Sequence, residues 1–408
     1  FCSPPYSPYY TIHSFIEIIL AIVKKKIIIA VNSTFNLTNH RVGLINGLLD
    51  GGYEVIATSP TDEFASRVKE LDCHHVPLQM ERKGTNIGRD LLLFWRYRTV
   101  LRQYMPDIYL GFTAKPNIYG SLAAQSLGIP VINNISGLGT VFGAMSTSLV
   151  GSLLGRLLRV LYWFALLRSD KIFFQNKDDR REFIQQRVVK AHLTELLPGS
   201  GVDLERFSYN PITANQLVPK ANNEKKKTRF LLVARMLWDK GVGEYVEAAR
   251  LLSRRYPCTE FCMIGFLDFQ NPEAISEVQI NEWIAEGIIQ YLGVINDIRP
   301  EIVKADCVVL PVLFREGTPR SLLEAAAIGR PIITTNTIGC RETVDDRVNG
   351  YLCIPSNAID LSEKMERILQ LDDAQRVKMG RYGREKMELQ FDEQIVIKKY
   401  LEAIKKCL

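Results

Sequence analysis

The sequence has few of the residues that build protein metal sites. It contains five histidines, and its eight cysteines include no C-x2-C pair. Cys258 and Cys262 form the only close cysteine pair, and neither they nor the adjacent His74 and His75 have the ligand spacing of a zinc site. These absences argue against a zinc centre. Cysteines scattered in this way favour a reduced compartment.

A long apolar run is also lacking at the start of the chain. The apolar stretch 15–23 is too short to span a bilayer. Lys24, Lys25 and Lys26 follow this stretch, whereas basic residues precede the apolar part of a secretory signal. The sequence begins with Phe1 and not with Met. We therefore interpret residues 1–24 as an extension outside the fold.

The overall composition is that of a globular protein. The 408 residues are 47% hydrophobic and 24% charged, and their net charge is +6. This length predicts two or three domains. The charge is too small to indicate nucleic acid, which is not expected as a partner. It suits anionic partners such as diphosphates or acidic lipid headgroups.

Short β-branched runs alternate with helical patterns from Lys26 onward, which is typical of βαβ units. The expected strands are 27–31, 54–58, 108–111, 131–133 and 171–175, and then 230–234, 260–264, 288–292, 307–310, 332–335 and 350–353. Helices of the first half are expected near 40–50, 62–70, 87–104, 116–127 and 177–187. The sequence thus predicts an α/β protein with two Rossmann-like, doubly wound domains.

The alternation lapses in the middle of the chain. After 198–203 the sequence becomes polar and rich in breakers over 210–227, as linkers between domains are. We therefore expect a first domain over 25–210, a second over 211–385 and a terminal helical segment over 386–408.

One helical segment, 149–167, is apolar over most of its circumference. At helical spacing, Arg156, Arg159 and Trp163 fall on one narrow stripe with Ser152. A basic stripe beside a leucine-rich face suits a helix that lies in a membrane interface. The alternative is a core helix whose arginines reach out to solvent.

The segment 315–331, R-E-G-T-P-R-S-L-L-E-A-A-A-I-G-R-P, directly follows an expected strand. We expect Thr318 to cap a helix with Pro319 in its first turn. The free N–H groups of Arg320, Ser321 and Leu322 could then bind a diphosphate. An ordinary capped helix is the alternative.

Charged residues flank this helix start. Glu316 and Glu324 lie eight positions apart, and a carboxylate is a natural acceptor for ribose hydroxyls. The loop 233–241 follows another strand and carries Arg235 and Lys240, two cations that suit a departing diphosphate. A solvated loop with incidental basic residues is the alternative.

Together these motifs resemble glycosyltransferase family 4, retaining enzymes with the GT-B fold. The resemblance rests on Arg235 and Lys240, the E-x7-E pair that follows about eighty residues later, and the segment 339–350. It runs from about residue 26 to the C-terminus, and 198–207 matches the end of the family's first domain. It implies two Rossmann-like domains facing across a cleft, with a last helix that crosses back to the first domain.

The same resemblance implies roles for the motif residues. Arg235 and Lys240 would bind the donor diphosphate, Glu316 the donor sugar and Glu324 the ribose. The expected catalytic residues are thus Glu316, Arg235 and Lys240, and the expected donor-binding residues are Glu324, Gly317, Thr318, Arg320, Ser321 and Leu322. Uracil would be held by backbone groups near 294–299.

Segments 115–124 and 131–140 look like those of bacterial members that extend lipid-linked sugars in polysaccharide, lipopolysaccharide O-antigen or glycoprotein assembly. The implied enzyme is a hexosyl- or N-acetylhexosaminyltransferase that moves a sugar from a UDP-sugar donor to a lipid-linked saccharide, with undecaprenyl diphosphate as the expected carrier. It would be cytoplasmic, bound peripherally to the inner face of the cytoplasmic membrane through the 149–167 helix.

The expected acceptor-binding residues are His40, Arg41, Lys115, Gly137 and Gly139. Arg41 and Lys115 could meet an acceptor phosphate, although structural roles stay open for both. The loop 32–41 lacks the glycine pair that these enzymes often have there. Gly137 and Gly139 would let the backbone approach a substrate closely, or would simply form a flexible loop.

No D-x-D motif occurs, so no metal-bridged diphosphate is expected and the enzyme should need no metal or other cofactor. Our hypothesis for retention is a front-face reaction in which the leaving diphosphate deprotonates the acceptor hydroxyl. Two alternatives remain: a UDP-sugar 2-epimerase of the same fold, or a non-catalytic subunit that binds nucleotide sugars.

Overall fold

The computed structural model describes residues 24–81, 87–137, 149–212, 227–268, 271 and 273–408. Its chain divides into two compact units. The first comprises residues up to 133 together with 164–171 and 400–408, and the second comprises 134–163 and 172–399. The domain boundaries expected from the sequence stay predictions.

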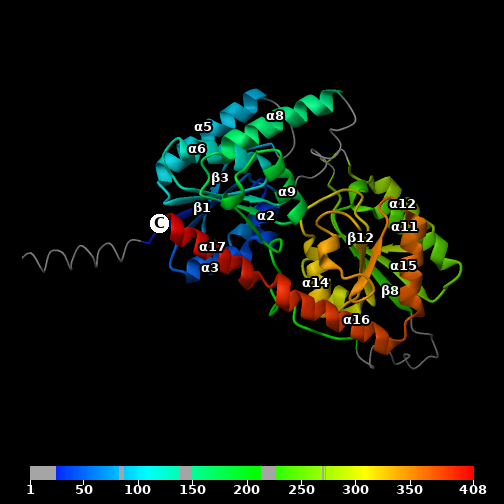
Figure 1. Ribbon diagram of the computed structural model, residues 1–408. Helices are drawn as coiled ribbons and strands as arrows, with labels where there is room; N and C mark the ends of the chain where they lie inside the picture. Colours follow the sequence, from blue (N-terminus) through cyan, green and yellow to red (C-terminus); the bar gives the residue numbers. More distant parts are fainter. Residues whose placement is uncertain (1–23, 82–86, 138–148, 213–226, 269–270, 272) are drawn as a thin grey trace, which may run out of the picture. The chain divides into compact units, whose positions relative to one another are not determined.

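Seven strands within the described ranges form the first sheet, in the order β3-β2-β1-β4-β5-β6-β7. Their bounds are β1 Lys26–Ala30, β2 Glu54–Ser59, β3 His74–Pro77, β4 Ile108–Phe112, β5 Val131–Ile135, β6 Lys171–Phe174 and β7 Thr194–Leu196. Figure 1 labels β1 and β3 of this sheet. β1 pairs in parallel with both β2 and β4, which gives the strand order of a Rossmann fold.

The five strands expected in this half are confirmed, but the expectation missed β3 and β7. Both lie at the edges of the sheet, and they are only four and three residues long. No residue of β3 is fully buried. An edge strand buries little, so it needs no apolar run that would reveal it in the sequence.

Helices connect these strands: α2 Thr34–His40, α3 Val42–Asp50, α4 Ala65–Val68, α5 Ile87–Tyr104, α6 Ser121–Gln125, α8 Leu149–Leu166 and α9 Lys177–Gln185. α5 and α6 pack on one face of the first sheet, where they bury side chains of β1, β2 and β4. Tyr97 of α5 meets Tyr109 of β4 edge to face, with ring centroids 6.1 Å apart. None of the described helices is sufficiently long and apolar to cross a membrane.

In the part of the chain described after 227, six strands form a second, parallel sheet with the order β10-β9-β8-β11-β12-β13. Their bounds are β8 Thr228–Val233, β9 Thr259–Ile264, β10 Ile289–Tyr291, β11 Cys307–Leu310, β12 Ile332–Thr335 and β13 Gly350–Cys353. All six expected strands are confirmed. The prediction of two Rossmann-like sheets is therefore correct.

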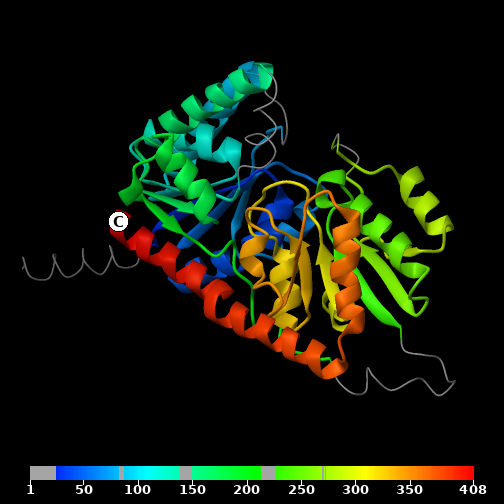
Figure 2. The same ribbon diagram turned by 45° about the vertical axis from the view of Figure 1, so that its right-hand side comes forward.

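Both faces of the second sheet are covered by helices (Figure 2). These helices are α11 Val242–Ser253, α12 Glu277–Ala285, α13 Arg299–Lys304, α14 Arg320–Ile328 and α15 Ala358–Gln370. Phe230 and Leu232 of β8 join the core beneath α11 and α15, whereas Leu231 joins the core beneath α13 and α14. This alternation is the period of two that a strand buried on both sides imposes.

Two further helices end the chain, α16 Asp373–Lys386 and α17 Glu393–Cys407. Asp372 caps α16 and forms a capping box with Gln375. Near the start of α17, Val202 and Asp392 form an isolated parallel bridge. The first residues of α17 belong to the second unit and the last to the first unit.

Candidate active site

The predicted site gathers at the carboxyl edge of the second sheet. β8 and β11 are parallel neighbours, so the loops that follow them leave the sheet side by side. The first loop carries the short 3-10 helix Trp238–Lys240, and the second leads to α14. Leu313 donates its backbone N–H to the Asp239 carbonyl at 3.0 Å, which joins the two loops directly.

Lys240 and Glu316 are the closest charged pair of this site. The Lys240 ammonium donates a hydrogen bond to Glu316 Oε2, although the residues lie 76 positions apart. Their side chains are 14% and 22% exposed. Burial alone would lower the pKa of Lys240, but the carboxylates of Glu316 and Asp239 outweigh burial and raise it. Lys240 is therefore a fixed cation at neutral pH.

Arg235 adds a second cation beside this pair. It donates to Asp268 Oδ2 at 3.0 Å, and its side chain is about one-third exposed. Its charge acts on Lys240, whose pKa it lowers slightly against the larger effect of Glu316. The structure thus brings Arg235, Lys240 and Glu316 to one edge, where Arg235 is the more accessible cation.

The start of α14 differs from the sequence prediction. The helix begins at Arg320, and Pro319 occupies the N-cap position with extended dihedral angles. Thr318 makes no cap hydrogen bond, and among the described residues its buried Oγ1 atom has no partner. The predicted Thr318 cap is wrong, because the chain enters the helix one residue later than expected.

Within α14, Glu324 points back toward the start of the helix. It is 8% exposed and accepts from Arg320 Nε at 3.1 Å. Burial raises the pKa of Glu324, while Arg320 and Arg206 partly offset this increase. Ser321 is half-buried and Leu322 is fully buried in the core, so any contact of Leu322 with a ligand must come from its backbone.

Two glycines allow a close backbone approach beside Glu316. Gly137 has φ +133°, and a Cβ atom there would lie 2.5 Å from the Gly317 nitrogen. A Cβ on Gly317 would in turn overlap the Ser136 carbonyl oxygen and the Gln175 side chain. The structure therefore joins Gly137 and Gly317, which the sequence placed in separate predicted roles.

The Glu316 carboxylate also touches a residue that the sequence reasoning did not assign. Cys340 Sγ lies 3.9 Å from Glu316 Oε1, and the Glu316 N–H donates to the Ile338 carbonyl at 3.1 Å. Burial, reinforced by the Glu316 charge, raises the pKa of Cys340 to about 12. This thiol therefore stays protonated, which makes it unsuitable as a nucleophile.

The predicted acceptor residues lie in the first unit, apart from the two glycines. The Arg41 guanidinium lies 4.1 Å from the centroid of the Phe112 ring and is nearly fully buried. Lys115 Nζ pairs with Asp90 Oδ1 at 2.6 Å, and His40 packs edge to face against Phe35. Gly139 falls outside the described residues. The acceptor role of all these residues stays a prediction.

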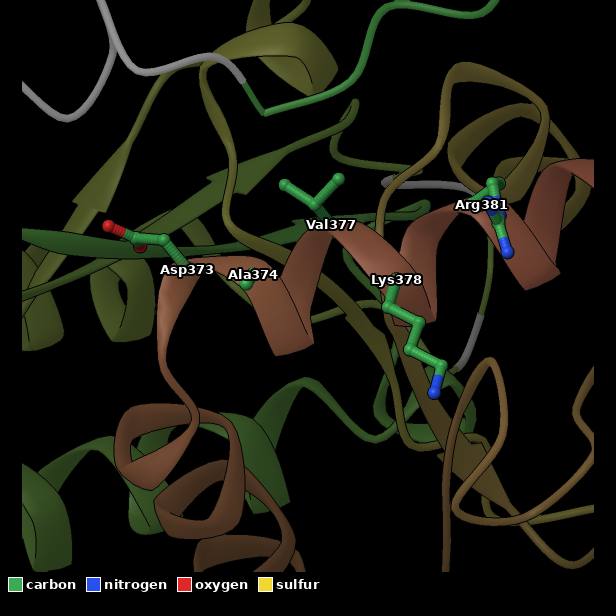
Figure 3. Close-up of a pocket in the computed structure, with 5 residues that line it drawn as sticks. All are labelled: Asp373, Ala374, Val377, Lys378 and Arg381. Carbon is green, nitrogen blue, oxygen red and sulfur yellow. The ribbon is translucent and has the colours of Figure 1, made fainter.

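No group of three His, Cys, Asp or Glu side chains in the described ranges could hold a metal ion. The expected metal independence is still a prediction. Figure 3 shows a pocket elsewhere, on the surface of α16, lined by Asp373, Ala374, Val377, Lys378 and Arg381. None of the predicted site residues lines this pocket.

Comparison with known proteins assigns both halves of the chain. Residues 38–199 match the family described as "Glycosyl transferase 4-like domain", and residues 214–386 match "Glycosyl transferases group 1". The solved structure of Anabaena HepE in complex with UDP and glucose is similar over 94% of this chain and all of that chain, with a TM-score of 0.74 at 16% identity. This similarity shows the fold.

Two curated relatives are similar in sequence. N,N'-diacetylbacillosaminyl-diphospho-undecaprenol alpha-1,3-N-acetylgalactosaminyltransferase of Campylobacter jejuni is 28% identical over 370 residues, which cover 90% of this chain and 95% of the relative. The UDP-Gal:alpha-D-GlcNAc-diphosphoundecaprenol alpha-1,3-galactosyltransferase of Escherichia coli is 28% identical over 64% of this chain and 65% of its own length. The chain belongs to the glycosyltransferases of the family 4 type and has the GT-B fold.

Proposed function

We propose that this glycosyltransferase moves a hexose or N-acetylhexosamine from a UDP-sugar to a saccharide linked to undecaprenyl diphosphate, with retention of configuration. The observation that carries the proposal is the contact between Lys240 and Glu316 next to Arg235 and the start of α14. This arrangement supplies cations and helix N–H groups for a diphosphate and a carboxylate for sugar hydroxyls.

The charges of Lys240 and Glu316 compensate each other in their direct contact. A bound donor would separate Lys240 from Glu316, because its diphosphate would attract Lys240 and Arg235 while its sugar hydroxyls would donate to Glu316. Negative charge on the diphosphate grows as the glycosidic bond breaks, so fixed cations stabilise the transition state more than the ground state. The leaving diphosphate then takes the proton of the acceptor hydroxyl, and no enzymic nucleophile takes part.

The proposed acceptor class rests on the curated relatives. Both names specify a sugar attached to diphospho-undecaprenol as the acceptor, and both specify an alpha-1,3 linkage. The Campylobacter relative matches 90% of this chain, so we take the acceptor in its name as a guide to this one. We infer glycan assembly on a lipid carrier, at the inner face of the cytoplasmic membrane.

Helix α8 supports contact with such a membrane. Its buried side includes Tyr162, Ala165 and Leu166, but the segment also exposes Leu157, Val160, Trp163, Phe164 and Leu167. Arg156 and Arg168 are exposed in the same segment. Apolar side chains flanked by arginines suit an interface between anionic headgroups and acyl chains.

The test is transfer in vitro. UDP-glucose, UDP-galactose and their N-acetyl forms are each incubated with the protein and a synthetic undecaprenyl-diphosphate-linked saccharide, and the product anomer is determined by NMR. We expect transfer from one of these donors with an α-linkage, at a rate that EDTA leaves unchanged. An inverted product would overturn the retaining mechanism. Epimerised UDP-sugar without transfer would overturn the proposed function.

A further inference from the structure

The segment that carries Glu316 is held by contacts with helix α9, which lies outside the donor motif. Arg315, the residue before Glu316, forms ion pairs with Asp179 and with Glu182, the latter at 2.9 Å. Both acids belong to α9, three positions apart, so they share one face of that helix. The Arg315 guanidinium is largely buried, so these contacts are shielded from solvent.

Asp179, the carboxylate partner of Arg315, is itself held by hydrogen bonds. Asn176 caps α9 and accepts from the Asp179 N–H at 2.7 Å, while its amide donates to Asp179 Oδ2 at 2.9 Å. Asp179 is fully buried and lies in the first turn, where the helix dipole favours a negative charge. These hydrogen bonds hold the Asp179 carboxylate independently of its contact with Arg315.

The other side of Glu316 is tied to the same helix. Asp178 Oδ2 accepts from Arg341 Nη2 at 2.5 Å. Arg341 directly follows Cys340, whose sulfur contacts the Glu316 carboxyl group. The same loop packs Gly339 against the Glu316 carbonyl group so closely that a Cβ atom there would overlap it. The two loops that surround Glu316 are therefore both held by the first turns of α9.

We propose that α9 is a positioning element for Glu316, acting through the pairs of Asp179 and Glu182 with Arg315 and of Asp178 with Arg341. This inference rests on the proposed function, because it takes Glu316 as the group that contacts the donor sugar. The α9 acids touch no substrate themselves. They fix the Glu316 carboxylate, and small errors in such a position lower the rate of a reaction more than they weaken binding.

The first experiment separates turnover from binding. Asp179→Asn keeps the volume and the hydrogen bond to Asn176 but removes the charge that Arg315 meets. We expect kcat to fall by roughly 10- to 100-fold. The Kd for UDP, measured by calorimetry, should stay within about two-fold, since Arg235 and Lys240 are untouched. Glu366→Gln removes a remote ion pair with Arg255, formed at 2.9 Å, and serves as the matched control with unchanged kcat.

The second experiment tests whether α9 acts through Glu316. In a Glu316→Gln background, Asp179→Asn should lower the residual rate by less than about two-fold, because the carboxylate it positions is gone. A general structural role would give the same fractional loss in both backgrounds, together with weaker UDP binding. Equal losses would overturn the positioning role.

Folding is checked by circular dichroism and thermal melting. If Asp179→Asn does not fold, Glu182→Gln and Asp178→Asn provide the same test. Both acids are partly exposed, and each substitution removes only one ion pair. A Glu316→Gln enzyme with full activity would refute the donor site itself. Loss of activity in Glu316→Gln with wild-type kcat in all three α9 variants would refute only the inference about α9.

Discussion

The Lys240 ammonium and the Glu316 carboxylate are in direct contact, although they follow different strands of the second sheet. Each charge offsets part of the cost of burying the other, so removing either residue deprives its partner of the nearest counter-charge. Donor binding would replace this contact with two others, to phosphate and to sugar. The pair therefore links the stability of this site to its proposed chemistry.

Replacing Lys240 tests this link. Lys240→Ala should lower kcat on the order of 10²-fold, because a preorganised cation for the leaving diphosphate is lost. It should also weaken UDP binding in calorimetry. Lys364→Ala is the matched control, since Lys364 is 16% exposed and pairs with Asp360 at 3.1 Å, but lies on α15. Equal activity of the two variants would contradict the assignment of Lys240.

Gly317 should tolerate no side chain. Gly317→Ala places a methyl group against the Ser136 carbonyl, so the variant should lose about 1–3 kcal/mol of stability and most of its transfer activity. The control is Gly383→Ala, whose added methyl would meet Ala326 at an ordinary 3.5 Å. Thermal melts and transfer assays of both proteins check this prediction. A fully active Gly317→Ala protein would mean that the backbone contact is dispensable.

Glu393 at the start of α17 should make stability depend on pH. Burial, reinforced by the Asp203 carboxylate, raises the pKa of Glu393 from 4.5 to about 7. Between these values the folded protein holds a proton that the unfolded chain has released, so stability falls as pH rises through this window. Glu393→Gln should therefore melt at a higher temperature than the wild type at pH 8, and the difference should shrink toward pH 4.5. Melts across this pH range provide the measurement.

The exposed face of α8 should bind anionic membranes. The double substitution of Leu157 and Val160 by aspartate should weaken co-sedimentation with phosphatidylglycerol vesicles on the order of ten-fold, because apolar contact is lost and like charges repel. Val278→Asp on α12 and Ile359→Asp on α15 are controls, since both side chains are equally apolar and more exposed. Loss of vesicle binding in these controls as well would show that the effect does not depend on α8.

Local sequence patterns determined most of the architecture. Apolar runs such as 230–234 and 307–310 report burial on both sides, so the interior strands of both sheets could be located from the sequence alone. The resemblance to glycosyltransferase family 4 likewise rested on residue types in sequence order, and it predicted a donor site at Arg235, Lys240, Glu316 and Glu324. The apolar runs depend on neighbours along the chain, which a sequence displays directly.

Contacts between distant segments could be decided only by the tertiary structure. Nothing in the periodicity of β8 and β11 states that they are neighbours, yet that strand order is what brings Lys240 to Glu316. The helix expected near 177–187 places Asp179 in its first turn, but the pairing of Asp179 with Arg315 spans 136 positions. Such pairings depend on which surfaces pack together, because folding buries charges only where a partner has been brought within reach.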